Sequence, residues 1–282
     1  MADPAIAEWQ KARSLNPRIP VLDRNLGRAL FLLKQDQAAI DVFREGLKTD
    51  PANVELYTGL TQALAILDRP AEERVRVLES YPDRAAMPSP LALDLALSYA
   101  EAGRFRDAEA MFHNRHFEKQ EGAASAAEVY VEVRLQEALA LAQHGKRDEA
   151  RRIVASLAQP VEGVEFTAGA LRASLDNPRL QFYEGRVESL LGNDAAAREF
   201  WTKAAAGHGV FAVLAAKQLD MSTWKSRATE MSAGDSIDAG DALLALGRTE
   251  DARRVFREVL REPDHNLSHY RARRGLALAD KG

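Results

Sequence analysis

The sequence predicts an all-α protein in which antiparallel helix pairs stack into a superhelical solenoid. Three observations support this fold class. The 282 residues are rich in the helix formers Ala, Leu, Arg and Glu, and only 7% are aromatic. Apolar residues recur at helical spacing, as in Leu91, Leu95 and Tyr99, while alternating runs of β-branched residues are absent from the sequence. A short phrase also occurs four times, as GRFRDA, GKRDEA, GNDAAA and GRTEDA.

The repeated phrase is typical of a turn between two helices. Its glycine fits a left-handed residue that ends one helix, and an acidic residue soon follows, near the positive end of the next helix dipole. Its alanine allows two helices to approach closely. A bulky apolar residue stands four positions after that alanine, and two further pairs of this kind lie upstream: Ala5/Trp9, Ala39/Phe43, Ala108/Phe112, Ala150/Val154, Ala197/Trp201 and Ala252/Phe256.

These alanine–bulky pairs resemble the second-helix half of the tetratricopeptide repeat. Pro17 and Pro51 close two successive units and are 34 residues apart, which is the period of that repeat. Gly27, Gly185 and Gly240 stand in the first-helix half of their units. The resemblance implies a right-handed superhelix of about six helix pairs whose first helices line a concave groove.

Along the chain, we expect a single domain over residues 1–282. It begins with a half-repeat over 1–18, which acts as a cap or as the cut end of a longer chain; the second is the favoured interpretation. Regular-length units follow over 20–53 and 54–82, then longer irregular units over 89–260, with insertions near 113–125, 158–178 and 205–235. A capping helix is predicted over 265–279, and its polar residues indicate a solvated terminal surface: His265, Ser268, His269, Arg271 and Arg274.

Several phrases resemble a narrower group, the C-terminal repeat region of a bacterial domain-of-unknown-function family. They are NPRIPVLDRNLGRAL, EERVRVLESYPD and NRHFEKQEG. In the third phrase Arg115, Phe117, Glu121 and Gly122 match the family, whereas Gln120 replaces a tryptophan. The resemblance implies a recognition module attached to a β-rich half that resembles carbohydrate-active proteins.

Composition limits the function classes. With 38 basic and 42 acidic residues the formal net charge is -4, which argues against a nucleic-acid partner. Absence of cysteine excludes disulfides and thiol chemistry. The sequence has no stretch typical of a membrane span and no secretion signal at its start, so we expect no membrane partner and a cytoplasmic location.

We expect no enzyme activity, no catalytic residue and no cofactor. P-loop, G-x-S-x-G and H-E-x-x-H motifs are absent from the sequence, and the Rossmann-like string GHGVFA follows a helix rather than a strand. Two histidine groups, His265/His269 and His113/His116 with nearby glutamates, have spacing compatible with a metal, but exposed polar residues are the commoner explanation. We therefore predict no metal site.

The best binding candidates lie on the expected concave face and in the insertion at 113–125. Arg24 and Arg28 are four residues apart and could grip a carboxylate, with a salt bridge from Arg24 to Glu55 as the alternative. The complete candidate set is Arg24, Asn25, Arg28, Glu55, Gln62, Arg115 and Glu121.

The leading functional hypothesis is a protein–protein interaction or scaffold module that binds a protein or peptide segment, with the absent N-terminal half of its own chain as one candidate partner. The alternative is an accessory module of a carbohydrate-active enzyme, in which Arg115 and Glu121 complete or gate a sugar site. A third hypothesis is an array that forms a homodimer through apolar surface on residues 1–18.

Overall fold

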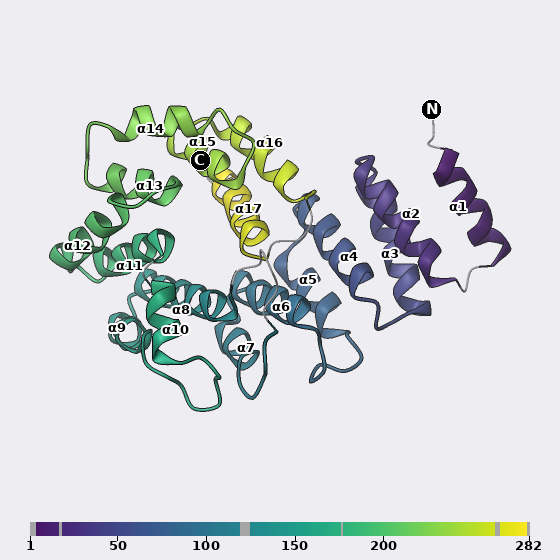
Figure 1. The fold of residues 1–282 in the computed structure, drawn as a ribbon, viewed down its shortest axis with the longest axis horizontal. Coiled ribbons are helices and arrows are strands. Elements are labelled where there is room, and N and C mark those ends of the chain that lie inside the picture. Colours follow the sequence, from purple (N-terminus) through teal and green to yellow (C-terminus); the bar gives the residue numbers. More distant parts are fainter. Residues whose placement is uncertain (1–3, 17–18, 119–124, 176, 263–265, 281–282) are drawn as a thin grey trace.

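The computed structural model describes residues 4–16, 19–118, 125–175, 177–262 and 266–280. Within these ranges the chain forms seventeen α-helices and no strand, so the predicted all-α class and solenoid are confirmed (Figure 1). The helices are α1 (Pro4–Leu15), α2 (Pro20–Leu32), α3 (Asp36–Thr49), α4 (Val54–Ile66), α5 (Ala71–Glu79), α6 (Ser89–Glu101), α7 (Phe105–Ala110), α8 (Ala126–Gln143), α9 (Arg147–Ser156), α10 (Ala168–Leu175), α11 (Pro178–Leu190), α12 (Asp194–Ala205), α13 (Val210–Gln218), α14 (Trp224–Met231), α15 (Ile237–Ala245), α16 (Thr249–Val259) and α17 (Asn266–Ala279).

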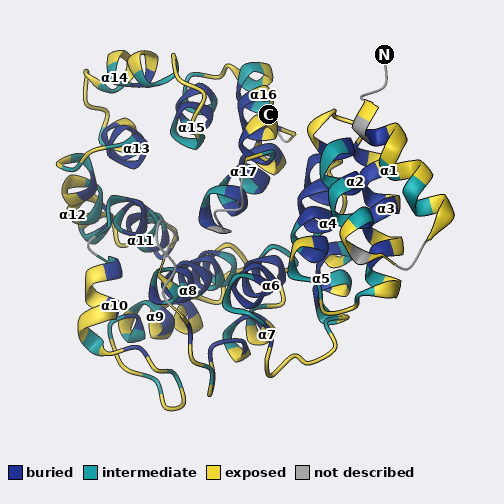
Figure 2. Cartoon of the chain, turned by 45° about the vertical axis from the view of Figure 1, so that its right-hand side comes forward, coloured by how far each residue is buried: buried dark blue, intermediate teal, exposed yellow. Residues whose placement is uncertain are grey.

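The helices form successive antiparallel pairs, from α2/α3 to α15/α16. From α6 to α15, the first helix of each pair faces the centre of the curved chain and the second faces outward (Figure 2). The region 205–235, expected as an insertion, contains the complete pair α13/α14. The region 158–178 contains the additional helix α10, which packs against α8 and α11.

The turns inside these pairs use left-handed residues. Gly103, Gly145, Gly192 and Gly247 have φ angles of 75°, 76°, 79° and 77°. After Gly103, the N–H of Arg104 donates to the carbonyl of Tyr99 at 2.8 Å, which closes the end of α6. Three other pairs place Lys34, Asp68 and Asp220 in the same region of φ, so a search for glycine alone misses these turns.

The bulky residue of the repeated pattern packs against glycines of neighbouring first helices. Phe43 of α3 is 1% exposed and lies between Gly27 of α2 and Gly59 of α4. A Cβ atom added at either glycine would stand 2.4 Å or 2.5 Å from an atom of the Phe43 ring. Phe256 of α16 packs on Gly240 of α15 in the same way. The glycines are therefore required for the close approach of successive helices.

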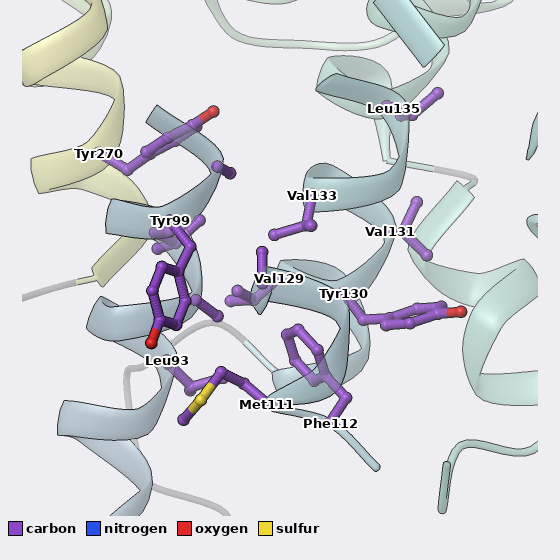
Figure 3. Close-up of a cluster of buried hydrophobic side chains, with 14 of the residues drawn as sticks. Leu93, Tyr99, Met111, Phe112, Val129, Tyr130, Val131, Val133, Leu135 and Tyr270 are labelled. Carbon is purple, nitrogen blue, oxygen red and sulfur yellow. The ribbon is translucent and has the colours of Figure 1, made fainter. Parts of the chain in front are cut away.

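The largest apolar cluster fills the space between α6, α7, α8 and α11. Figure 3 shows Tyr99 of α6, Phe112 after α7 and Val133 of α8 among the side chains of this cluster. The ring of Phe112 meets that of Tyr130 edge-on, with centroids 5.2 Å apart. Tyr270 reaches the same cluster from α17, so the last helix contributes to the core of the middle repeats.

The last helices of the solenoid pack against its early helix pairs. The chain curves so that α16 and α17 lie beside α4 and α6 (Figure 1), and α17 packs directly against α6. A second apolar cluster combines Phe31 and Leu60 of the first pairs with Val259 and Leu276 of the last helices. The curved chain is therefore closed by an apolar contact between segments some 200 residues apart in sequence, as the bond from Gln62 to the carbonyl of Glu262 illustrates.

Arginines of the C-terminal segment complete this closure. Both terminal nitrogens of Arg261 donate to the carboxylate of Asp36, at 2.9 and 2.8 Å, and one also donates to the carbonyl of Phe31 at 2.8 Å. Arg273 of α17 bonds to Glu101 of α6 at 2.7 Å. Such fork-shaped contacts to carboxylates fix orientation as well as distance.

The predicted solvated surface of the last helix is wrong. His269 is 2% exposed, and Arg273 is also buried. Arg271 donates to Asp238 and Asp241 of α15 at 2.7 and 2.6 Å. The polar residues of α17 therefore form contacts between helices, because the helix lies inside the curve instead of standing at an outer end.

Replacement of Gly59 by alanine should destabilise the protein by about 1–3 kcal/mol, because the new methyl group overlaps the Phe43 ring. Chemical denaturation of the variant measures this loss. Gly169→Ala on α10 is the control, since the nearest atom to its added Cβ is Thr167 Oγ1 at 3.7 Å. An equal effect of both substitutions would contradict the packing explanation.

Replacement of Arg261 by glutamine should cost roughly 1–3 kcal/mol of stability, because the buried carboxylate of Asp36 loses its partner. A double-mutant cycle with Asp36→Asn should show that the two residues are coupled. Lys34→Gln is the control, since its pair with Glu258 is exposed and such pairs contribute roughly 0–1 kcal/mol. Independent effects of Arg261 and Asp36 would show that this contact does not hold the ends together.

Candidate functional site

Two cavities lie on the inner side of the curve and share one wall. The first, here named the central pocket, has a volume of about 450 Å³ and is lined mainly by α5, α6, α8 and α17. The second, named the C-terminal pocket, has a volume of about 530 Å³ and is lined by α11, α13, α15 and α17. Arg186, Arg274 and Leu278 line both pockets and are named the shared wall.

The C-terminal pocket has an aromatic lining. The ring centroids of Phe182 and Tyr183 are 5.6 Å apart, and each lies 5.8 Å from the ring centroid of Phe211. The guanidinium of Arg271 stands 4.6 Å from the Phe211 centroid and is held there by two aspartates of α15. This lining is fixed in place by contacts within the protein and offers a preformed apolar surface to a ligand.

The arginines of the shared wall each stand beside a tyrosine. Tyr183 and Arg186 are three residues apart on α11, and Tyr270 and Arg274 are four apart on α17, so each pair occupies one helix face. The Arg274 guanidinium lies 5.8 Å from both tyrosine ring centroids and donates to the Tyr270 hydroxyl at 3.4 Å. Burial lowers the pKa of Arg186, and the positive charge of Arg274 lowers it further, against the opposing effect of Tyr183.

The sequence-predicted residues of the first full repeat lie on α2 and α4. Arg24 forms the anticipated alternative contact, a salt bridge with Glu55 at 2.8 Å, and its Nε donates to the side chain of Asn25 at 3.2 Å. Arg28 stands 5.8 Å from the ring centroid of Phe31. The two arginines therefore have different surroundings, and the positive charge of Arg24 is already opposed by Glu55.

The remaining predicted residues have mostly internal contacts. Gln62 is 4% exposed and donates to the carbonyl of Glu262 at 3.5 Å, so closure of the chain removes it from the groove. Arg115 donates to the backbone carbonyls of Met87 and Arg84, which secures the segment that follows α7. Glu121 lies outside the described residues.

A further cavity of about 880 Å³ is lined by the segments around Phe117 and Phe166. At its edge, His116 Nδ1 lies 2.8 Å from a carboxylate oxygen of Glu165. Burial would raise the pKa of Glu165, but the Phe117 N–H and His116 lower it below its ordinary value. His113 borders a different cavity, so the structure separates the histidines of this segment.

Among the described residues, no three side chains of the metal-binding types gather closely enough to hold a metal ion. His265, half of the second histidine pair, lies outside those residues. None of the described helices has the length and apolar character needed to cross a membrane.

Sequence reasoning missed the shared wall. The sequence analysis assigns Arg274 to a solvated terminal surface and does not single out Arg186. The available signal was an aromatic residue and an arginine one turn apart on two predicted helices, Tyr183/Arg186 and Tyr270/Arg274. That signal does not reveal that the two helices face each other across an inner wall.

Comparisons with known proteins agree with the repeat architecture. The sequence model of the tetratricopeptide repeat family matches residues 3–54 and 237–279. One similar solved structure is that of YrrB, described as a TPR protein with an unusual peptide-binding site; it has 18% sequence identity, covers 70% of this chain and 90% of its own, and gives a TM-score of 0.45. The structure of a tetratricopeptide repeat protein from Parabacteroides merdae has 14% sequence identity and a TM-score of 0.47. The match covers 98% of this chain and 91% of the Parabacteroides protein. No curated protein matches the chain.

One carboxyl group outside the pockets has an unusual acidity. Burial raises the pKa of Glu184 to about 7, the neighbouring Glu188 adds to the rise, and Lys203 opposes it. Glu184 stands two positions from Arg186 on α11, a rotation of about 200°, so it faces away from the shared wall. The raised pKa of Glu184 therefore affects the stability of the protein and not the chemistry of the inner pockets.

Stability should fall as pH rises through the window from about 4.5 to 7, because the unfolded chain releases this proton while folded Glu184 retains it. Glu184→Gln removes this contribution and should gain about 1–2 kcal/mol relative to the parent between pH 5 and pH 8. Denaturation at both pH values measures the difference. The control is Glu230→Gln, which removes an exposed carboxylate from α14; an equal pH effect there would refute the assignment to Glu184.

Proposed function

We propose that this chain is a non-catalytic binding module whose inner face accepts an extended segment of another protein. The observation that carries the proposal is the pair of pockets that meet at the shared wall. Solenoids of helix pairs create curved surfaces suited to extended ligands. Here that surface combines fixed aromatic rings with an exposed apolar side chain, Leu278, which is 53% exposed.

The lining of the C-terminal pocket suits a peptide side chain. Leu214 and Leu244 are partly exposed at its rim, beside the aromatic rings of Phe182 and Phe211. Its volume of about 530 Å³ falls within the range of small-ligand pockets. An apolar side chain that enters this pocket is removed from water, which favours binding by about 25 cal/mol for each Å² of apolar area buried.

The finer hypotheses about the partner remain predictions. A β-rich half of the same protein would be one natural source of the bound segment, and self-association through residues 1–18 would be another assembly. The carbohydrate-active alternative, in which Arg115 and Glu121 complete or gate a sugar site, also stays a prediction. Arg115 donates to two backbone carbonyls, and Glu121 lies outside the described residues.

The test is a selection of twelve-residue peptides from a random display library, followed by anisotropy measurements on the selected peptides. Leu278→Trp places a larger side chain at the shared wall and should weaken binding at least about tenfold, because the tryptophan fills space that the peptide needs. Met221→Trp is the matched control: Met221 is 43% exposed and lines neither inner pocket.

Unchanged binding by Leu278→Trp would place the peptide elsewhere on the protein. Failure to select any peptide from the library would count against the binding function itself.

A further inference from the structure

The lining of both inner pockets is richer in positive than in negative charge, although the whole chain carries a formal net charge of -4. The C-terminal pocket is lined by three arginines and one aspartate. The central pocket is lined by five arginines and three acidic residues. Each of those three acids already pairs with an arginine: Asp68 with Arg257, Glu101 with Arg74 and Arg273, and Asp280 with Arg253.

Most buried arginines nearby have a carboxylate partner. Arg271 pairs with two aspartates, Arg273 with Glu101, and Arg179 with Glu128 at 2.7 Å. Arg186 and Arg274 differ, because neither forms an ion pair with a described carboxylate. Their guanidinium groups nevertheless line the same wall, and they are half-buried.

Two half-buried like charges without a counter-ion form an unfavourable arrangement that a bound anion would relieve. Burial is the main cause of the lowered pKa of Arg186, and the charge of Arg274 lowers it further. The pKa of Arg274 is itself raised, because Tyr270, Tyr183 and Glu132 together outweigh its burial. Two acidic residues, Glu132 and Asp241, interact electrostatically with Arg274. Both accept hydrogen bonds from other side chains: Glu132 from Gln136, and Asp241 from Arg271. The protein itself therefore leaves these two donors available.

We propose that Arg186 and Arg274 together bind a carboxylate of the extended segment that occupies the inner face, so that the partner is an acidic peptide. The inference rests on the proposed binding function and names its chemical class. The carboxylate is supplied by an Asp or Glu side chain or by a free C-terminus, since guanidinium groups pair with either. The aromatic lining beside the wall favours an apolar residue next to that carboxylate.

The experiment measures hexapeptide libraries that differ only in charge. One set carries Glu at a fixed central position and a matched set carries Gln there, and each set is made with a free or an amidated C-terminus. We expect peptides with a carboxylate to bind at least about tenfold more tightly than their neutral counterparts, with the preference weakened by salt. Comparison of the four sets identifies which source supplies the carboxylate.

In the double variant Arg186→Gln/Arg274→Gln, peptides with and without the carboxylate should bind with nearly equal affinity. Arg254→Gln is the matched control for charge, because Arg254 lies on α16 with a 72% exposed side chain and should leave the preference unchanged. Thermal unfolding of each variant verifies that it is folded. Leu278→Glu provides a second variant: its new carboxylate at the shared wall should pair with the arginines and selectively weaken acidic peptides, whereas Leu278→Gln should not.

The outcomes separate the two proposals. Peptides that bind without any preference for a carboxylate, or whose preference survives in both the double variant and Leu278→Glu, overturn the carboxylate site while the binding function stands. Absence of binding by every peptide set overturns both.

Discussion

The contact on which the rest of the structure depends is the ionic junction between α17, α6 and α5. Burial alone would raise the pKa of Glu101, but Arg273 and Arg74 lower it below its ordinary value, so the carboxylate stays charged between two arginines. Buried charges of this kind require good geometry and mutual pairing. The junction holds the last helix inside the curve, and both inner pockets exist only because α17 forms one side of each.

The same placement of α17 explains the chemistry of the inner surface. Arg273 faces α6 and Arg271 faces α15, so two arginines of one helix are used to attach it to opposite sides of the curve. Arg274 follows directly in sequence and, together with Arg186 of α11, lines both inner pockets. Arg273, which attaches the helix, and Arg274, for which we propose a binding role, are thus adjacent in sequence and lie on different faces of α17.

Much of the repeat architecture could be predicted from the sequence because its causes are local. The turn glycines and the alanine–bulky pairs act within a few residues, and Phe43 and Phe256 occupy the glycine contacts that the pattern indicates. The pair α13/α14 was missed because Asp220 replaces the turn glycine. Closure could not be predicted, since Arg261 and Asp36 are 225 positions apart. The shared wall depends on that closure, so the position of its two arginines could not be predicted from the sequence either.

Closure also has a mechanical consequence. An open solenoid behaves as a spring, because each repeat contacts only its neighbours and small rotations add up along the chain. Here the attachments of Arg261 and Arg273 connect distant repeats, so the pitch of the superhelix cannot change without breaking them. The spacing between the two pockets is therefore set by the protein. The segment that we propose to bind across both pockets would have to match that spacing through its own length and conformation.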